Sequence, residues 1–164
     1  MSDVPDVVGH LDHEQKQTAR YIEVSPAHGD RKETSLFKHA RASLVLHYGC
    51  YIDNAECDHG SPLEAHHYFT EWSKTNAVDW VKFRQFVEKT HLVNPQNGMA
   101  LSEICWPDVM RDPATFVDSS YNLVILCAEH HRSMSNGIHH LPYSIWLLQR
   151  YLVDGFDISK PYQP

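Results

Sequence analysis

The sequence predicts an α+β fold that is mainly helical. Apolar side chains recur at helical spacing in three segments, residues 35–48, 72–92 and 142–154. By contrast, residues 123–126 are apolar throughout, which is typical of a short buried strand. A chain of 164 residues can bury one hydrophobic core but is too short for two domains that each bury a sizeable core. We therefore expect a single domain in which helices flank a small amount of strand.

The first 34 residues differ in composition from the rest of the chain. They are polar and acidic, they are interrupted by proline and glycine, and they hold only one strand-like run, residues 20–24. We expect residues 1–34 to form an arm or a short edge strand. The domain itself is then expected to span residues 35–164.

The first two predicted helices differ in how clearly their ends are marked. The first helix follows a Thr34/Ser35 cap and stops at Gly49, because these residue types favour helix starts and ends. The second helix lies within residues 72–92 and is expected to start near Asn76 or Ala77.

The middle of the chain is expected to be less regular. Residues 94–98, Asn-Pro-Gln-Asn-Gly, predict a strong turn, and one short helix is expected near residues 102–106. Cys105 lies in this stretch beside a tryptophan, and we expect it to be a core residue. After the strand at residues 123–126, a short helix is predicted over residues 128–135.

The last predicted helix has a favourable first residue and an apolar stripe. Proline is well tolerated in a first helical turn, so Pro142 suits its start, and Gly155 suits its end. Ile145, Leu148 and Leu152 lie three and seven residues apart along one face. We expect this stripe to be part of the core or the seam of a homodimer.

The overall charge limits how the protein can hold a nucleic acid. Fourteen basic and 21 acidic residues give a net charge of −7 when the 13 histidines are neutral. This sign excludes a protein that contacts phosphates over its whole surface, so any nucleic-acid contact must be local. We find no basic leader followed by an apolar run, and we expect an intracellular, cytoplasmic protein of bacterial or phage origin that has no membrane contact.

Two short segments supply four possible zinc ligands. Cys50 and Cys57 form one pair, and Cys127 and His130 form a second pair with the spacing Cys-x2-His. Four sulfur and imidazole ligands complete a tetrahedral structural zinc site, which we prefer to two disulfides in a chain without an export signal. Six residues between Cys50 and Cys57 exceed the usual spacing, so His47 or His59 could replace one ligand. The remaining alternative is that these are small buried thiols and a core histidine.

A second group combines the adjacent pair His66-His67 with Asn122 and His131. These residues lie in two blocks, Leu-Glu-Ala-His-His-Tyr at residues 63–68 and Asn-Leu-Val-Ile-Leu-Cys-Ala-Glu-His-His at residues 122–131. The two blocks together resemble the HNH, or His-Me finger, nuclease family. The resemblance implies two strands and a helix folded over one divalent metal ion, with residues 72–120 as a helical insertion between the blocks.

The resemblance also implies a role for each residue of this group. His66 and His131 would bind the catalytic metal, and His67 would activate water as the general base. Asn122 would fix the first strand and the orientation of the base. Imidazole ligands suit Zn²⁺, Ni²⁺ or Mn²⁺, and Mg²⁺ would fit if waters and the phosphate completed its shell.

Elementary geometry agrees with this division between the two neighbouring histidines. Adjacent side chains of an extended segment point to opposite faces, so His66 and His67 cannot both bind one ion. A neutral imidazole with a pKa near about 6.5 can take a proton from water at neutral pH. Arg132, which follows the site histidine, is the best candidate for a phosphate contact.

The third protein ligand of this metal stays open at the level of sequence. His139 or His140 could fold back toward the site, although a histidine pair just before Leu141-Pro142 is more typical of a solvated loop. Exposed basic residues such as Lys38, Arg41, Lys82 and Arg84 could line a groove, but charges on helix faces usually serve only solvation.

The sequence therefore favours an endonuclease that is stabilised by a structural zinc ion and hydrolyses phosphodiester bonds, with DNA as the preferred substrate. A second hypothesis is a catalytically silent zinc-binding module that binds a protein partner as a regulator or an inhibitor. A third is a nuclease that works only inside a larger assembly, where a basic partner supplies the contact with DNA.

Overall fold

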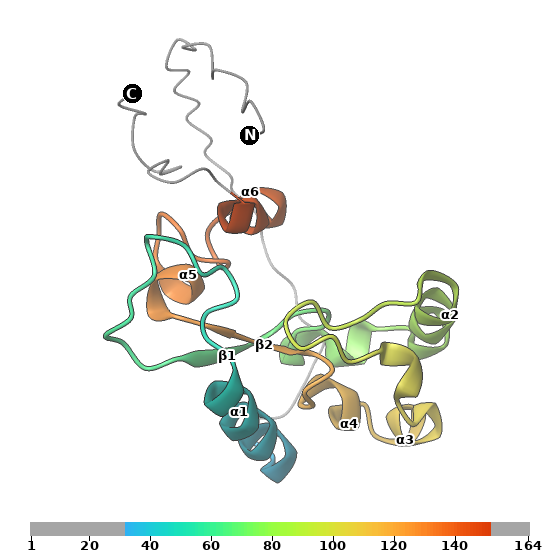
Figure 1. Ribbon diagram of the computed structural model, residues 1–164. Helices are drawn as coiled ribbons and strands as arrows, with labels where there is room; N and C mark the ends of the chain where they lie inside the picture. Colours follow the sequence, from blue (N-terminus) through green and yellow to red (C-terminus); the bar gives the residue numbers. More distant parts are fainter. Residues whose placement is uncertain (1–31, 152–164) are drawn as a thin grey trace, which may run out of the picture.

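A two-stranded antiparallel sheet lies at the centre of the structure, a computed structural model that describes residues 32–151 (Figure 1). Strand β1 (Glu64–His67) pairs with β2 (Leu123–Leu126), so that Glu64 lies opposite Leu126 and His67 lies opposite Leu123. The strand expected at residues 123–126 is therefore confirmed, and the fold is a mixture of helices and a small sheet. Most of the expected arm, residues 1–31, and the expected helix end at Gly155 lie outside the described residues.

One face of the sheet is covered by helix α1 (Ser35–His47). The sequence predicts this helix from Ser35 and its end near Gly49. The Thr34 side chain caps this helix by accepting a hydrogen bond from the Phe37 N–H at 3.0 Å. Phe37, Ala40 and Leu44 follow at spacings of three and four residues and are buried against the strand β2. Helix α1 therefore fixes the face of the sheet onto which Ala65 and His67 project.

The opposite face of the sheet is covered by the segment around helices α5 (Ala128–Arg132) and α6 (Tyr143–Leu148) (Figure 1). Val124 and Leu126 pack there against Ile52 and Trp146 in one buried cluster. Helix α6 begins directly after Pro142, as predicted, and is followed by the 3-10 helix η3 (Gln149–Tyr151). The predicted apolar stripe of the last helix is not tested, because the side chains that form it lie outside the described part.

Helix α5 ends at Arg132, so the predicted helix over residues 128–135 is too long. Ser133 has extended backbone angles, and its hydroxyl accepts a hydrogen bond from the Ser135 N–H at 3.2 Å. Serine side chains that bond their own backbone compete with helix continuation. The chain then turns tightly at Gly137, where a Cβ atom would lie 2.5 Å from the Ser133 carbonyl oxygen. This early stop returns the chain toward α5 and β1.

The segment between the strands forms a helical layer with its own apolar cluster (Figure 1). Its elements are η1 (Trp72–Ala77), α2 (Trp80–Thr90), η2 (Leu101–Glu103), α3 (Trp106–Arg111) and α4 (Ala114–Val117). Val87, Leu101, Val109 and Phe116 are fully buried between them.

Three sequence expectations for this segment are wrong in detail. Helix α2 starts at Trp80, because Asp79 caps it by accepting from the Lys82 N–H at 3.0 Å, and residues 72–77 form a separate 3-10 turn. The stretch after residue 100 is more helical than expected, with α3 and α4 in place of one short helix. Cys105 is exposed at the start of α3 rather than buried in the core.

Within residues 32–151, none of the helices combines the length and the apolar composition that crossing a bilayer requires.

Candidate metal centres

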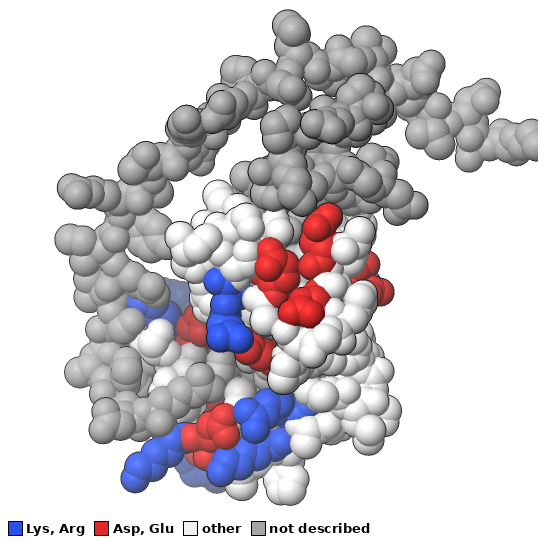
Figure 2. Space-filling view, turned by 90° about the vertical axis from the view of Figure 1, so that its left-hand side faces the viewer, with Lys and Arg blue, Asp and Glu red and all other residues white. Residues whose placement is uncertain are grey.

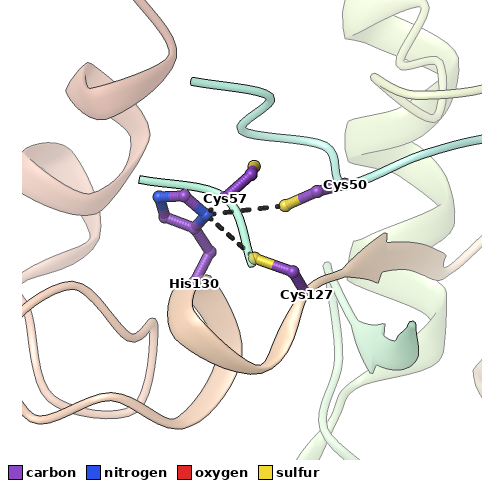
Figure 3. Close-up of side chains that lie close together, drawn as sticks. All are labelled: Cys50, Cys57, Cys127 and His130. Carbon is purple, nitrogen blue, oxygen red and sulfur yellow. Dashed lines mark hydrogen bonds between the residues drawn. The ribbon is translucent and has the colours of Figure 1, made fainter. Parts of the chain in front are cut away.

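Three cysteines and one histidine converge beside the sheet (Figure 3). Cys50 and Cys57 come from the loop between α1 and β1, Cys127 follows β2, and His130 lies in α5. The His130 Nδ1 atom is 3.6 Å from Cys50 Sγ, 3.6 Å from Cys57 Sγ and 3.2 Å from Cys127 Sγ. The structure thus brings together the four ligands that the sequence predicts.

The dimensions of this Cys₃His cluster match those of a tetrahedral zinc site. Zn–S and Zn–N bonds of about 2.3 and 2.0–2.1 Å in a tetrahedron place sulfur and nitrogen roughly 3.5–3.6 Å apart. All four donor atoms lie within 4.8 Å of one another, and all four residues are buried. The cluster could therefore bind a structural metal such as zinc.

Without a bound ion, burial keeps Cys50 and Cys57 of this cluster in the neutral thiol form. Burial raises the pKa of the Cys50 thiol, and burial together with the neighbouring Cys50 raises the pKa of Cys57 to about 12. Burial lowers the pKa of His130, so its ring is neutral. A divalent ion at this position would offset the cost of burying thiolates, and its binding would release protons.

The long spacing between Cys50 and Cys57 is explained by the loop that joins them. Asp53 adopts a left-handed conformation with φ 48°, and the Cys57 N–H donates to the Asn54 carbonyl at 3.1 Å. The loop therefore doubles back and returns the second sulfur to the first. All four cysteines are free, and neither His47 nor His59 belongs to the cluster, so the two substitute ligands are not needed.

A second group consists of His66, His131 and His139. His66 Nδ1 lies 3.3 Å from His131 Nε2, and the three ring centroids are 5.0 to 5.2 Å apart. His66 belongs to β1, His131 belongs to α5, and His139 lies in the loop that leads to α6. The sequence left the third member open and favoured a solvated loop for residues 139–140. Both residues are exposed, as expected, and the His139 ring also lies against the other two rings.

Two carboxylates lie against ring nitrogens that point away from the centre of this histidine cluster. Glu64 accepts a hydrogen bond from His131 Nδ1 at 2.5 Å, and Glu71 lies 3.5 Å from His66 Nε2. Carboxylates in these positions fix the ring orientation and the tautomer of metal-binding histidines. They leave His66 Nδ1 and His131 Nε2 facing each other, which is the arrangement that a shared cation requires.

Two rings of the histidine cluster, His66 and His131, are neutral at physiological pH. Burial and the nearby rings of His131, His139 and His67 lower the pKa of His66 to about 3. Burial also lowers the pKa of His131, although the contact with Glu64 opposes this shift. Neutral imidazole is the form that binds a metal ion, so the donor set fits a divalent cation.

His67 lies on the other face of the sheet and is not part of this cluster. Its ring stacks on Phe37 of α1 with centroids 5.7 Å apart, and its Nε2 atom lies 3.3 Å from the Asp118 Oδ1 atom. Its Nδ1 atom is 3.9 Å from Glu71, and only 4% of the residue is exposed. The alternation of side chains along β1 thus separates the two adjacent histidines, as expected from their positions in the sequence.

Asn122 connects the end of β1 with the start of β2 from a fully buried position. Its side-chain oxygen accepts hydrogen bonds from Phe69 and Thr70 N–H at 2.8 and 3.1 Å. Its amide group donates to the carbonyls of Thr70 and Val117, both at 2.9 Å. All four bonds go to backbone atoms, so this side chain holds the segment that follows His67 in place.

Arg132 lies at the end of α5 with a side chain that is 64% exposed. Its guanidinium contacts Glu64 at 2.7 Å, on the same carboxylate that binds His131. An open groove of about 480 Å³ begins beside this group and runs past Ala65 to Phe37 and Arg41 of α1. Of the histidine cluster, only His131 lines this groove.

Charge on the molecular surface is divided into small groups. Figure 2 shows one face on which most lysine and arginine side chains gather at the lower edge with acidic side chains among them, while a second group of aspartate and glutamate side chains lies higher up. Several of the described cations are paired, as Arg41 is with Glu33 and Arg84 is with Glu88. On this face, the part formed by residues 32–151 shows no continuous basic track for a nucleic acid.

Comparison of the chain with protein-family models, with curated proteins and with solved structures found no match.

Sequence reasoning missed three acidic residues at the histidine cluster and around His67. These are Glu64, Glu71 and Asp118. A signal was available only for Glu64, because residues two apart in a strand share a face and Glu64 precedes His66 by two. Glu71 and Asp118 reach the site through loops whose paths follow from tertiary packing.

Proposed function

We propose that this protein is a metal-dependent endonuclease of the HNH type that hydrolyses phosphodiester bonds in DNA. The observation that carries the proposal is the 3.3 Å approach of His66 Nδ1 to His131 Nε2, with His67 turned to the opposite face of the sheet. The supporting order of elements is strand, strand and helix, formed by β1, β2 and α5. This arrangement agrees with the resemblance of the two sequence blocks to that family.

The roles of the chain's residues follow from their positions. His66, His131 and His139 would hold one divalent cation, which would neutralise charge on the scissile phosphate and on the leaving oxygen. His67 takes a proton from the attacking water, while the water oxygen bonds to phosphorus and the ester bond to the leaving oxygen breaks. Arg132 exchanges Glu64 for a phosphate oxygen when the substrate binds.

The Cys₃His cluster supports this site through its place in the chain. Cys127 and His130 flank the start of α5, and His130 is adjacent to His131. A zinc ion on the four buried ligands would tie the loop of Cys50 and Cys57 to α5. We therefore assign this ion a structural role and expect it to hold His131 in position against β1.

The test is plasmid nicking by purified protein with added Mg²⁺, Mn²⁺, Ni²⁺ or Zn²⁺. We expect metal-dependent cutting that His67→Ala reduces by about 10²- to 10⁴-fold, because a general base contributes that much. The bound structural zinc should stay unchanged in this variant. His39→Ala is the matched control, since His39 is an exposed histidine of α1. Cutting by His67→Ala at the wild-type rate would refute the assigned base.

A second candidate function is a catalytically silent zinc-binding module that binds a protein partner. The net charge of −7 and the carboxylates of Glu64 and Glu71 beside the histidine cluster favour it, because both repel phosphates. Absence of cutting on single- and double-stranded DNA and RNA with all four metals would select this candidate.

A further inference from the structure

Asp118 is a buried carboxylate directly beside the proposed general base. It is the residue after helix α4 and is only 2% exposed. Its Oδ1 atom lies 3.3 Å from His67 Nε2. A carboxylate so far from water is costly unless hydrogen-bond donors surround it, so its neighbours must supply such donors.

The second oxygen of Asp118 is held by the start of helix α1. The Thr34 hydroxyl donates to Asp118 Oδ2 at 2.8 Å, and the Thr34 oxygen also accepts from the Phe37 N–H to cap the helix. Phe37 in turn stacks on the His67 ring with an interplanar angle of 26°. One helix start therefore fixes both the carboxylate and one face of the imidazole.

The contact with Asp118 decides which nitrogen of His67 carries the proton. An ionised carboxylate can only accept hydrogen bonds, so the His67 nitrogen that faces it must be the N–H donor. In the neutral ring the proton is then on Nε2, and the lone pair is on Nδ1. Nδ1 lies 3.9 Å from Glu71, which is too far for a hydrogen bond, so the nearer carboxylate of Asp118 determines the tautomer. The other oxygen of Glu71 approaches His66, so the lone pair on Nδ1 lies on the side of the histidine cluster.

We propose that Asp118 is a positioning residue that accepts the Nε2–H of His67 and thereby presents Nδ1 to the attacking water. The inference rests on the proposed nuclease function and adds the group that orients its base. The proton of the water moves to Nδ1 as the new bond to phosphorus forms. Asp118 keeps its charge throughout and does not take the proton, as expected for a carboxylate that orients a histidine.

The first experiment measures the tautomer of His67 directly in the wild-type chain. Nitrogen-15 NMR of histidine-labelled protein, assigned by the His67→Ala variant, distinguishes a protonated Nε2 from a protonated Nδ1. We expect the Nε2–H tautomer at neutral pH. A His67 that carries its proton on Nδ1 would overturn the proposal, whether or not the protein cuts DNA.

The second experiment uses Asp118→Asn, which keeps the size of the side chain but removes its charge. We expect single-turnover cleavage to fall by about 10²-fold or more, because a misoriented base loses much of its contribution. The tautomer signal of His67 should shift toward Nδ1–H, while the metal concentration that gives half-maximal cutting changes by less than about twofold. A purely structural role for Asp118 would lower thermal stability without moving the tautomer.

Asp108→Asn is the matched control, because Asp108 is an exposed carboxylate on α3 whose loss changes the net charge equally. Thr34→Ala provides an intermediate case, since it removes one of the bonds to Asp118 and leaves the carboxylate in place. We expect it to lower the cleavage rate less than Asp118→Asn does.

The outcomes separate the two proposals. Wild-type cutting that Asp118→Asn leaves unchanged would refute the positioning role and leave the nuclease function intact. In another outcome, the wild-type chain never cuts but still shows the Nε2–H tautomer of His67, and this tautomer is lost in Asp118→Asn. That result would refute the nuclease function but support the hydrogen bond between His67 and Asp118. If Asp118→Asn does not fold, the tautomer of His67 in the wild type and the cleavage rate of Thr34→Ala test the positioning role instead.

Discussion

His66 and His67 are adjacent in sequence, yet they lie on opposite faces of β1 and share only the carboxylate of Glu71 among the side chains described around them. His66 faces His131 and His139, while His67 faces Phe37 and Asp118. This separation follows from strand geometry alone, so the sequence could predict it. The identity of the carboxylates around the two rings could not be predicted, because those groups come from loops that fold back from other parts of the chain.

Cys127 supplies the sulfur nearest to His130, at 3.2 Å, and its loss should remove the structural metal. We expect Cys127→Ser to release about one tightly held ion per chain and to lower the melting temperature by roughly 10 °C or more. Several kcal/mol of metal-binding free energy would be lost. Each kcal/mol lowers the melting temperature of a chain of this size by roughly 2–4 °C.

Native mass spectrometry and calorimetry measure these two effects. Cys105→Ser is the control, because Cys105 is exposed and lies outside the cluster. An unchanged metal content in Cys127→Ser would remove the structural-zinc assignment.

At the scale of elements, the unit β1, β2 and α5 brings the two sequence blocks together. Leu123–Leu126 could be predicted as a strand because all four residues are apolar, and all four are buried in the structure. Helix α1 could be predicted because a capping threonine precedes apolar residues at helical spacing. The ends of α2 and α5 were missed where a side chain, Asp79 or Ser133, bonds to the backbone and sets a boundary that periodicity does not reveal.

Asn122 is the side chain on which the geometry of this unit depends most. Asn122→Ala would leave four buried backbone groups, in Phe69, Thr70 and Val117, without their partner. We expect it to cost about 3 kcal/mol, since unsatisfied buried groups cost about 1–3 kcal/mol each and water can reach some of them after relaxation. The melting temperature should fall by roughly 6–12 °C.

Differential scanning calorimetry of the metal-loaded protein checks this expectation. Gln85→Ala, an exposed position within α2, is the control. A fall of less than about 2 °C for Asn122→Ala would show that the side chain does not hold the segment after His67.

At the scale of the whole molecule, a net charge of −7 predicts that only a few phosphates are contacted. We expect the logarithm of DNA affinity to fall with the logarithm of salt concentration at a slope between about −1 and −3, since each phosphate contact contributes about −0.9. Arg132→Ala should make the slope shallower by about one unit, because Arg132 is exposed at the histidine cluster.

Fluorescence anisotropy with a labelled duplex over a salt series gives this slope. Arg84→Ala is the matched control, since Arg84 is an exposed arginine of α2. A steep slope of about −6 or beyond would contradict a local contact and would require an extended basic surface.

The measurement that tests the central claim most directly is the anomalous X-ray scattering of crystals of the metal-loaded protein. We predict two ions in each chain, one on Cys50, Cys57, Cys127 and His130 and one on His66, His131 and His139. The imidazole of His67 should bind neither ion and should keep its contact with Asp118. An ion bound by His67, or His66 and His131 rings that lie too far apart to share an ion, would contradict the account.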